Sequence, residues 1–382
     1  MALPWQRPST PQIWAAEHDA LQLFWGDLPA GVLRATGGDT DVSIDHPGGP
    51  GALVVDGLAA DTAVRVTVSV DGTEVATVAG RTLPRPPGEL LARFATVSDL
   101  HIGARRWGFF KTMNEARAGL DDHPEAHPYR CAQAAIADAA TWGAEHLVIK
   151  GDGAHHRVPD DFAELGRLLD GFPDLAMTLL PGNHDVDEKS AVPLPATVGR
   201  RAVPYVRSVT ALDLPGVRIV AGDTTIEGKG SGTVEHHGDE VLSLVEGGPR
   251  GGGVIVATHQ QFQKAGPLTY WPPGIAPPGS VDFLAELGRV RPGTLVTSGH
   301  THRNRVRRVG DVVHSEVAST RDWPGVWGAY WIFEGGVVQS ARKISSPAAL
   351  AWHEYSKNAV GGVWERWAPG TLGDRCFTHR WR

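Results

Sequence analysis

Short apolar runs alternate with segments of helical spacing between about residues 92 and 300. The apolar runs are ARFATV (92–97), EHLVIK (145–150), LAMTLL (175–180), VRIVAG (217–222), GVIVAT (253–258) and GTLVTS (293–298). Three segments between them have helical spacing: 129–142, 160–172 and 281–290. Continuous runs of Val, Ile and Leu are typical of strands that are buried on both faces. The pattern therefore predicts an α/β domain with a largely buried sheet.

The chain before residue 89 has a different pattern. Short β-like runs are separated by turn residues, at 21–25, 51–55, 63–70 and 73–80. The last two runs flank Asp71-Gly72, which predicts a hairpin. The segment LPRPPGE (83–89) is typical of a stiff proline-rich linker. We therefore expect three regions: a small all-β domain with its linker at 1–88, the α/β domain at 89–345, and a tryptophan-rich C-terminal extension or cap at 346–382.

Polar residues follow five of the apolar runs in the α/β region. They are SDLH (98–101), GD (151–152), PGNHD (181–185), His259 and GHTH (299–302). Because ligands in open α/β sheets gather at the carboxyl ends of the strands, we expect these side chains to lie close together. Carboxylate, amide and imidazole groups without a thiolate suit Mn, Fe, Zn or Ni better than Ca or Mg. The sequence thus predicts a site for divalent metal ions, and two ions ~4 Å apart would need a bridging carboxylate.

In this order, the five blocks resemble the signature blocks of the calcineurin-like metallophosphoesterase superfamily. The resemblance extends from residue 93 to about residue 315, and its most specific parts are DLH (99–101), GNHD (182–185) and GHTH (299–302). It implies an α/β/β/α sandwich with a dinuclear metal centre at its strand ends, here preceded by the small all-β domain. The activity that it implies is metal-dependent hydrolysis of a phosphoester.

The resemblance also implies a role for nine residues. Seven would bind two divalent metal ions: Asp99, His101 and His302 the first, Asn183, His259 and His300 the second, and Asp152 both. His184 would face the phosphate as general acid or transition-state stabiliser, and Asp185 would orient the His184 ring. A hydroxide bridging the two ions would attack phosphorus in line.

The spacing of the blocks is similar to that of the class III cyclic nucleotide phosphodiesterase branch. The signature GDxVDRG of protein serine/threonine phosphatases is absent, because His155 stands at its second aspartate and Arg157 is one place late. No tyrosine of the purple acid phosphatase type lies near the GD block. We therefore expect hydrolysis of a small phosphodiester such as a cyclic nucleotide. A phosphomonoesterase or a lipid head-group phosphodiesterase is the alternative, followed by a DNA exonuclease or a catalytically silent binding module.

Four residues near the predicted centre are candidates for binding the substrate: His155, His156, Arg105 and Arg106. The two histidines follow Asp152 closely enough to reach a phosphate, although a solvated loop is the simpler interpretation. The two arginines begin a segment, 103–129, that combines basic and aromatic residues. Such a segment could stack a base and hold a phosphate, and a packed loop over the core is an equally good interpretation.

The N-terminal region resembles a fibronectin type III domain. The resemblance is carried by Trp25 in LFWGDLP, by GLAADTAVRVTV (57–68) and by RTLP (81–84). Val64 stands where that family usually has a tyrosine, so the corner hydrogen bond of such sandwiches would be missing. Another small β-sandwich is the alternative. Purple acid phosphatases often carry such a domain, so the pairing of domains does not separate them from other branches.

Composition sets limits on partners and location. The net charge of −7 argues against an extended nucleic-acid-binding surface. No apolar run is long enough to span a membrane, and the first residues lack the pattern of a Sec signal peptide. The two cysteines, Cys131 and Cys376, are expected to be free thiols in a reducing compartment. We therefore expect a cytoplasmic protein with a small phosphoester as its ligand; the oligomeric state is left open, a homodimer included.

Overall fold

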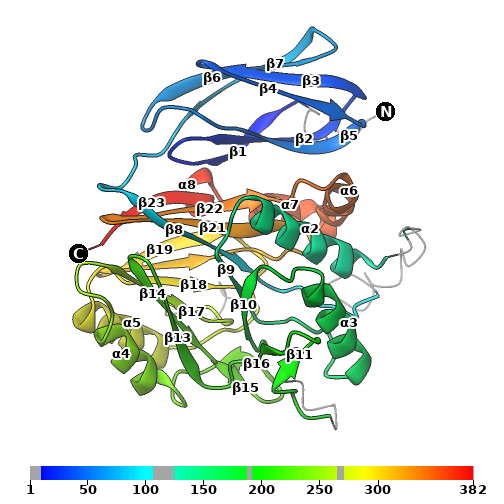
Figure 1. Ribbon diagram of the computed structural model, residues 1–382. Helices are drawn as coiled ribbons and strands as arrows, with labels where there is room; N and C mark the ends of the chain where they lie inside the picture. The colour runs from blue at the N-terminus through cyan, green and yellow to red at the C-terminus, as the bar shows by residue number, and fades with distance from the viewer. Residues whose placement is uncertain (1–9, 106–122, 124, 187–191, 265–270, 382) are drawn as a thin grey trace.

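The computed structural model describes residues 10–105, 123, 125–186, 192–264 and 271–381. Two six-stranded sheets stack at the centre of the molecule (Figure 1). The first sheet has the strand order β10-β9-β8-β21-β22-β23, and the second has the order β13-β14-β17-β18-β20-β19. Each sheet contains a run of parallel strands within a mixed arrangement. The parallel neighbours are β8, β9 and β10 in the first sheet, and β14, β17, β18 and β20 in the second.

The strands of the two sheets come from distant parts of the chain. Those of the first sheet are β8 (Leu90–Val97), β9 (His146–Lys150), β10 (Ala176–Leu180), β21 (Val326–Phe333), β22 (Gly336–Lys343) and β23 (Cys376–Arg380). Those of the second are β13 (Val209–Leu214), β14 (Val217–Gly222), β17 (Gly253–Ala257), β18 (Leu295–Ser298), β19 (Arg305–Val309) and β20 (Val312–Glu316). All six apolar runs of the α/β region are therefore strands.

Alternate residues of each strand face different layers, as the two-residue period of a strand requires. In β8, Phe94 packs between the two sheets and stacks on Tyr330 with ring centroids 4.3 Å apart. Its neighbours Ala95 and Val97 face the opposite way and pack with helix residues such as Ile136 and Leu165. Both faces of the strand are buried, which explains its nearly continuous apolar sequence.

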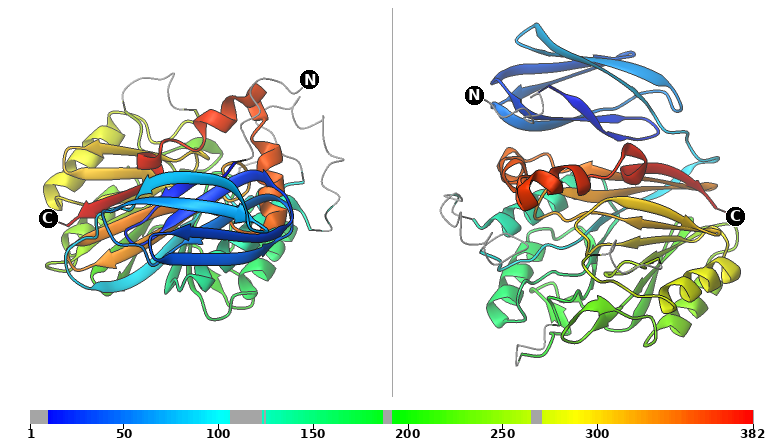
Figure 2. Two further views of the ribbon diagram at one scale, coloured as in Figure 1. Left: turned by 90° about the horizontal axis from the view of Figure 1, so that it is seen from above. Right: turned by 180° about the vertical axis from the view of Figure 1, so that it is seen from behind.

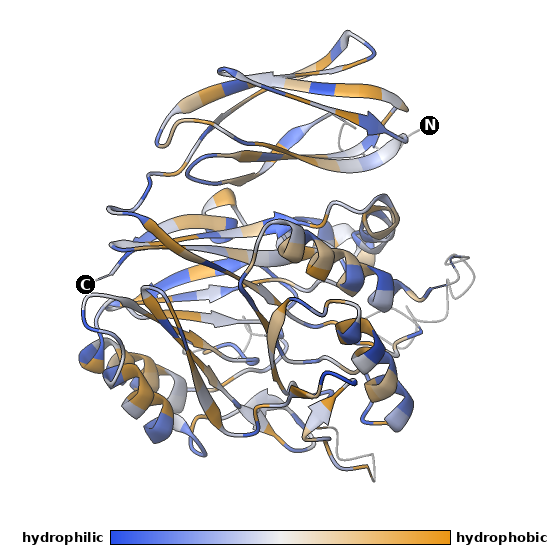
Figure 3. Ribbon diagram, in the orientation of Figure 1, coloured by the Kyte–Doolittle hydropathy of each residue, from blue (hydrophilic) through white to orange (hydrophobic). Residues whose placement is uncertain are grey.

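Helices cover the outer faces of both sheets. The helices α2 (His127–Thr141) and α3 (Pro159–Asp170) cover the first sheet, and α4 (Gly238–Glu246) and α5 (Gly279–Val290) cover the second. All four carry both apolar and polar residues (Figure 3). The three segments of helical spacing in the sequence correspond to α2, α3 and α5. The result is the predicted α/β/β/α sandwich, preceded by a small all-β region.

The N-terminal strands form two small antiparallel sheets. One has the order β1-β2-β5 and the other the order β4-β3-β6-β7. Their bounds are β1 (Gln12–Ala16), β2 (Leu21–Leu28), β3 (Gly31–Gly37), β4 (Thr40–His46), β5 (Gly49–Val55), β6 (Ala63–Val70) and β7 (Thr73–Arg81). The predicted hairpin is confirmed: β6 pairs with β7, and both residues of the Asp71-Gly72 turn have positive φ.

The N-terminal sheets lie over β22 and the C-terminal helices in every view (Figures 1 and 2). Trp14 and Phe24 share a buried cluster with Trp323, Ala341 and other residues of the later chain. The C-terminal helical elements are α6 (Pro347–Ser356), η2 (Ala359–Gly362), α7 (Val363–Trp367) and α8 (Leu372–Arg375), and β23 follows them into the first sheet. Residues 376–380 are therefore the edge strand of the first sheet.

Short strand pairs complete the structure. They are β11 (Thr197–Val198) with β12 (Val203–Pro204), and β15 (Thr225–Ile226) with β16 (Lys229–Gly232). Cys131 and Cys376 are both buried and form no disulfide with each other. Among the described residues, no helix has the length and apolar character needed to cross a membrane.

Candidate metal centre

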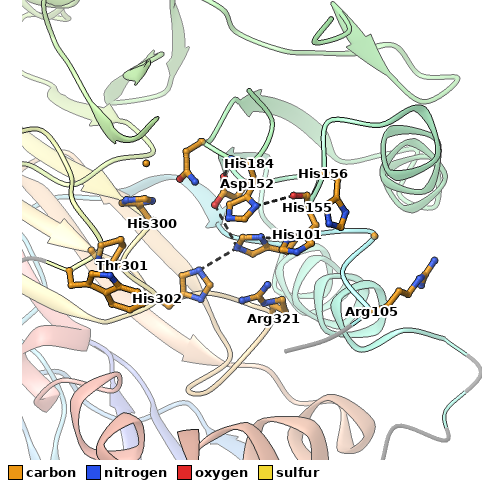
Figure 4. Close-up of a pocket in the computed structure, with 15 residues that line it drawn as sticks. His101, Arg105, Asp152, His155, His156, His184, His300, Thr301, His302 and Arg321 are labelled. Carbon is orange, nitrogen blue, oxygen red and sulfur yellow. Dashed lines mark hydrogen bonds and ion pairs between the residues drawn. The ribbon is translucent and has the colours of Figure 1, made fainter. Parts of the chain in front are cut away.

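The loops that follow the parallel strands meet at one edge of the stacked sheets. Main-chain hydrogen bonds join them: the Asp99 N–H donates to Gly151 O at 3.1 Å, and the His101 N–H donates to Asp152 O at 2.8 Å. A cavity of about 610 Å³ opens there, and its walls include most of the predicted site residues (Figure 4). The structure thus brings together blocks that lie 200 residues apart in sequence.

One group of donors surrounds Asp99. Its Oδ1 lies 3.4 Å from His302 Nε2, and His302 Nε2 lies 3.4 Å from His101 Nε2. All three side chains are buried, and together they form a cluster that could hold a metal ion. Asp99 Oδ1 is buried and accepts no hydrogen bond from the described residues. An ionised oxygen without a donor in such a place is costly unless a cation occupies the space beside it.

A second group of donors lies next to the first. His259 Nε2 is 3.2 Å from Asn183 Oδ1 and 3.5 Å from Asp152 Oδ1, and His300 belongs to the same cluster. The other carboxylate oxygen of Asp152 lies 3.6 Å from His101 Nε2, in the first group. Asp152 therefore has one oxygen in each group, which is the position that a bridging ligand requires.

The ring nitrogens that point away from the clusters have hydrogen-bond acceptors. His259 Nδ1 donates to Lys150 O at 2.7 Å, and His302 Nδ1 donates to Asp322 Oδ2 at 2.8 Å. His300 uses its other nitrogen, Nε2, to donate to Pro273 O at 3.1 Å. A neutral imidazole that donates on one side carries its lone pair on the other, so these rings are oriented as metal ligands.

The backbone is strained at the same residues. Nine residues other than glycine have positive φ among those described, and five of them are predicted ligands: Asp99 (56°), His101 (50°), Asp152 (51°), His300 (67°) and His302 (52°). Such conformations each cost of order 1–3 kcal/mol and cluster at functional sites. The flanking glycines allow the close approach, since a Cβ on Gly299 would lie 1.7 Å from Ser98 Oγ.

Charges in the cluster affect one another. Burial opposes ionisation of Asp99, but the charge of His302 outweighs it and lowers the pKa of Asp99. Burial likewise disfavours the charged form of His302, yet Asp322 and Asp99 raise its pKa to about 10. A proton on His302 thus takes the place of a cation among these carboxylates. The donor set, the unpaired oxygen of Asp99 and this excess of negative charge all fit divalent metal ions, whose binding would release that proton.

His184 lies at the cavity wall and is held by the main chain. Its Nδ1 donates to His155 O at 2.9 Å, and its ring stacks on that of His155 with centroids 4.9 Å apart. It lies edge-on to His101, a predicted ligand, at 4.6 Å. His184 is thus adjacent to the donor groups, while a short hydrogen bond fixes the direction of its ring.

Asp185 is predicted to orient the His184 ring, but that ring donates from Nδ1 to His155 O. The carboxylate of Asp185 instead accepts hydrogen bonds from Tyr205 Oη at 2.9 Å and from three main-chain N–H groups, those of Gly153, Ala154 and Gly182. Burial, together with the charge of Asp152, raises the pKa of Asp185 to about 6. Asp185 therefore joins two ligand loops. Its link to the His184 ring is indirect, through the loop that carries His155, whose carbonyl accepts the Nδ1 proton of His184.

The candidate substrate-binding residues differ in their surroundings. His155 is half-buried, contacts His101 Nδ1 through its own Nδ1 at 3.1 Å, and has a pKa lowered to about 2, first by burial and then by the charge of Arg321. His156 and Arg105 also line the cavity, but their side chains are 60% and 65% exposed. They pair with Asp161 at 3.1 Å and Glu164 at 3.3 Å, respectively. Arg106 lies outside the described residues, as do Trp107, Phe109 and Phe110.

The sequence did not reveal three residues at or beside the cavity. Arg321 and Asp322 lie in the loop between β20 and β21, where residues 317–320 separate them from the end of β20, so no polar residue directly at the strand end marks them. Arg321 lines the cavity and is only 6% exposed. Trp271 also lines the cavity and is 47% exposed, but no motif marks it in the sequence.

Comparisons with known proteins agree with the geometry. Residues 92–304 match the family model described as calcineurin-like phosphoesterase. Solved structures with similar folds include PhoD (9% identity, TM-score 0.39, 88% of this chain and 87% of that chain). They also include purple acid phosphatase PPD1 from yellow lupin (Lupinus luteus) seeds (10% identity, TM-score 0.44, 88% of this chain and 73% of that chain). These structural similarities are too distant to bear on the activity. A comparison with curated proteins found no match.

Proposed function

The chain belongs to the calcineurin-like phosphoesterase family of metal-dependent phosphoester hydrolases, and from this premise we propose that it hydrolyses a small phosphodiester, with cyclic nucleotides as the first candidates. The observation that carries the proposal is the pair of buried Asp and His clusters, whose members include Asp152, His101, His300 and His302 at the wall of one cavity. The volume of about 610 Å³ lies within the roughly 300–1,000 Å³ typical of small-molecule sites. A nucleotide-sized ester fits that range.

Seven residues would hold the two ions: Asp99, His101 and His302 the first, Asn183, His259 and His300 the second, and Asp152 both. When bound, the ions would activate water and neutralise charge on the phosphoryl oxygens. The imidazole-rich donor set favours Mn, Fe, Zn or Ni. What the chain itself contributes is orientation, because Lys150 O, Pro273 O and Asp322 fix the ring directions.

His184 is proposed as the general acid. Its Nδ1 proton is committed to His155 O, so protonation of the ring places the second proton on Nε2. From there the proton can pass to the leaving oxygen of the ester, and a positioned acid of this kind contributes roughly 10²–10⁴-fold to a rate. Asp185 would support this role by holding the loop that contains His155.

A phosphomonoester or a lipid head group is the second candidate substrate. It is favoured by the additional cationic side chains at the cavity, Arg321 and Arg105. A dianionic monoester has one more charged oxygen than a diester and would use such groups more fully. The similarity to class III cyclic nucleotide phosphodiesterases favours the diester.

The domain boundaries and the nature of the N-terminal region are also proposals. We propose a fibronectin type III-like domain with linker at 1–88, a catalytic domain at 89–345 and an extension at 346–382. The three-stranded and four-stranded antiparallel sheets, with Trp25 buried between strands, support the first assignment. A cytoplasmic location stays a prediction from the sequence.

Hydrolysis of bis-p-nitrophenyl phosphate and of p-nitrophenyl phosphate by the metal-loaded protein tests the proposal. We expect the diester to have the higher kcat/KM, and cyclic AMP to be converted to AMP. Preference for the monoester would favour the second candidate. In either case His184→Ala should lower kcat by roughly 10²–10⁴-fold without loss of metal. The exposed His236 provides the control, His236→Ala. Absence of hydrolysis of both esters, or an unchanged rate in His184→Ala, would overturn the enzymatic assignment.

A further inference from the structure

The loop that carries Arg321 is fastened directly to the metal-ligand loops. Ser319 Oγ donates to Asp99 O at 3.0 Å, and the Arg321 N–H donates to Ser319 Oγ at 2.9 Å. From the other side, Trp352 Nε1 donates to Arg321 O at 2.8 Å. The main chain of Arg321 is therefore held from two directions, and its side chain enters the cavity near His101 and His302 (Figure 4).

The guanidinium of Arg321 is buried but poorly satisfied. It has five N–H donors, and the described part of the chain gives them one acceptor, Asp322 Oδ2, at 3.2 Å from Nη2. Its Nε is buried and has no partner among the described residues. Asp322 is shared, since it also accepts from His302 Nδ1. A buried charge with unused donors is costly, and a ligand that accepts hydrogen bonds would remove that cost.

Arg342, whose side chain is 12% exposed, shows a bidentate pairing in the same protein. It donates from Nε and Nη2 to both carboxylate oxygens of Glu17, at 2.6 and 2.5 Å. Among the described residues Arg321 has no such partner, and it faces a cavity rather than a packed interface. This difference favours an anionic ligand as the acceptor for Arg321.

We propose that Arg321 binds a phosphoryl oxygen of the substrate, on the side of the cavity formed by His101 and His302. The planar donors of a guanidinium match phosphate oxygens, and the positive charge offsets the charge of the anion. The proposal rests on the proposed function, since it assigns the phosphate of that substrate to a residue outside the signature blocks. It makes Arg321 a substrate-binding residue in addition to His184.

A different role would leave Arg321 without substrate contact. Through its hydrogen bond to Asp322 it could act only on the orientation of His302, and it would then be a positioning residue for the metal. The two roles predict different losses. A positioning residue affects metal affinity, whereas a substrate-binding residue affects phosphate affinity while the metal content stays unchanged.

Binding of inorganic phosphate to the metal-loaded protein, measured by isothermal titration calorimetry, separates these roles. Arg321→Met removes the charge and keeps the side-chain length, and Arg321→Lys keeps the charge but not the planar fork. We expect Arg321→Met to bind phosphate roughly 10- to 100-fold more weakly, the loss expected for a charge-assisted hydrogen bond. Arg321→Lys should recover part of the loss. Metal content, measured by mass spectrometry of the same samples, should equal that of the wild type.

Two results would overturn the proposal. One is phosphate affinity within twofold of the wild type in Arg321→Met, and the other is a loss that disappears when metal is supplied in excess. Arg375→Lys is a matched control, because Arg375 is comparably buried (8% exposed) and bonds to Trp14 O outside the cavity. If the wild type binds phosphate through Arg321 but hydrolyses no ester, the proposed function fails and the anion site stands.

Discussion

Two buried clusters of polar side chains differ in how their charges are arranged. At the junction between the N-terminal sheets and β22, polar groups face complementary partners: Glu17 pairs with Arg342, and Gln22 bonds to the main chain of Lys343 at 2.9 and 2.8 Å. At the strand ends, groups that can bind a metal ion converge instead. His302 Nε2 lies 3.4 Å from both His101 Nε2 and Asp99 Oδ1, and Asp99 Oδ1 accepts no hydrogen bond from the described residues.

The two clusters of buried polar side chains differ in purpose: the junction cluster stabilises the fold, and the strand-end cluster serves function. A complementary pair satisfies itself, so the junction needs nothing from outside the chain. Converging carboxylates and imidazoles are costly to bury, and a bound cation removes that cost. The backbone shows the same contrast. Residues with positive φ gather at the strand ends, whereas φ is not positive at any of the four junction residues Glu17, Gln22, Arg342 and Lys343. The strand-end cluster is therefore the one that is built for a ligand.

Asp152→Asn should have the largest effect. It should lower activity and metal content without lowering stability. The substitution keeps the shape but removes the charge that joins the two donor groups, so we expect activity to fall by roughly 10³-fold or more. Metal bound per chain, measured by mass spectrometry, should fall to one ion or fewer. The thermal midpoint should not fall, since like charges are removed. Asp138→Asn, at a half-buried carboxylate bonded to Ser345, is the control. Two tightly bound ions in Asp152→Asn would show that Asp152 is no bridge.

Glu17→Gln should have the opposite effect. It leaves the buried guanidinium of Arg342 uncompensated, and breaking such a pair costs about 3–5 kcal/mol in unfolding free energy. Urea denaturation measures this loss. Metal content and kcat of the folded protein should match the wild type. If Glu17→Gln lost metal or activity while still folded, the junction would be part of the site and the contrast between the clusters would not hold.

Asp322→Asn should weaken metal binding to a smaller extent. Asp322 accepts from His302 Nδ1 at 2.8 Å, and loss of such a partner typically lowers metal affinity by about 10–100-fold. Competition with a chromophoric chelator gives the affinity directly. Excess metal should restore activity in Asp322→Asn but not in Asp152→Asn. Equal affinity in the wild type and Asp322→Asn would remove Asp322 from the metal centre.

His18→Gln should have the smallest effect, on the acid stability of the junction. His18 packs edge-on against Phe333 at 5.1 Å, and burial lowers its pKa from 6.5 to about 4. Between these values the unfolded chain binds more protons than the native protein, so stability falls as pH drops from about 6.5 to about 4. Urea unfolding at several pH values in this range gives the slope of the unfolding free energy against pH. In His18→Gln this slope should correspond to up to one proton fewer taken up on unfolding than in the wild type. Identical pH profiles for the two proteins would contradict the assignment.

The parts that could be predicted from the sequence are those determined by local pattern. Each ligand block follows its own apolar run, and the strand-end rule brings the runs together without knowledge of the sheet order. The hairpin at Asp71-Gly72 was equally predictable, because the turn needs residues that accept positive φ. The division into a β-rich N-terminal part and an α/β part followed from the change in period.

The parts that could not be predicted depend on contacts between distant residues. Nothing near Asp185 in the sequence indicates that Tyr205 and two amides of another loop would take its carboxylate in place of the His184 ring. Arg321 carries no motif, and its unused donors are visible only once its neighbours are known. The Glu17–Arg342 pair joins residues 325 positions apart, a distance over which sequence pattern carries no information.

Anomalous diffraction from crystals of the protein reconstituted with Mn²⁺ tests the central claim most directly. The account predicts two peaks ~4 Å apart, one among Asp99, His101 and His302 and the other among Asn183, His259 and His300, with Asp152 contacting both. A single peak, or none, at the ends of these strands would contradict it.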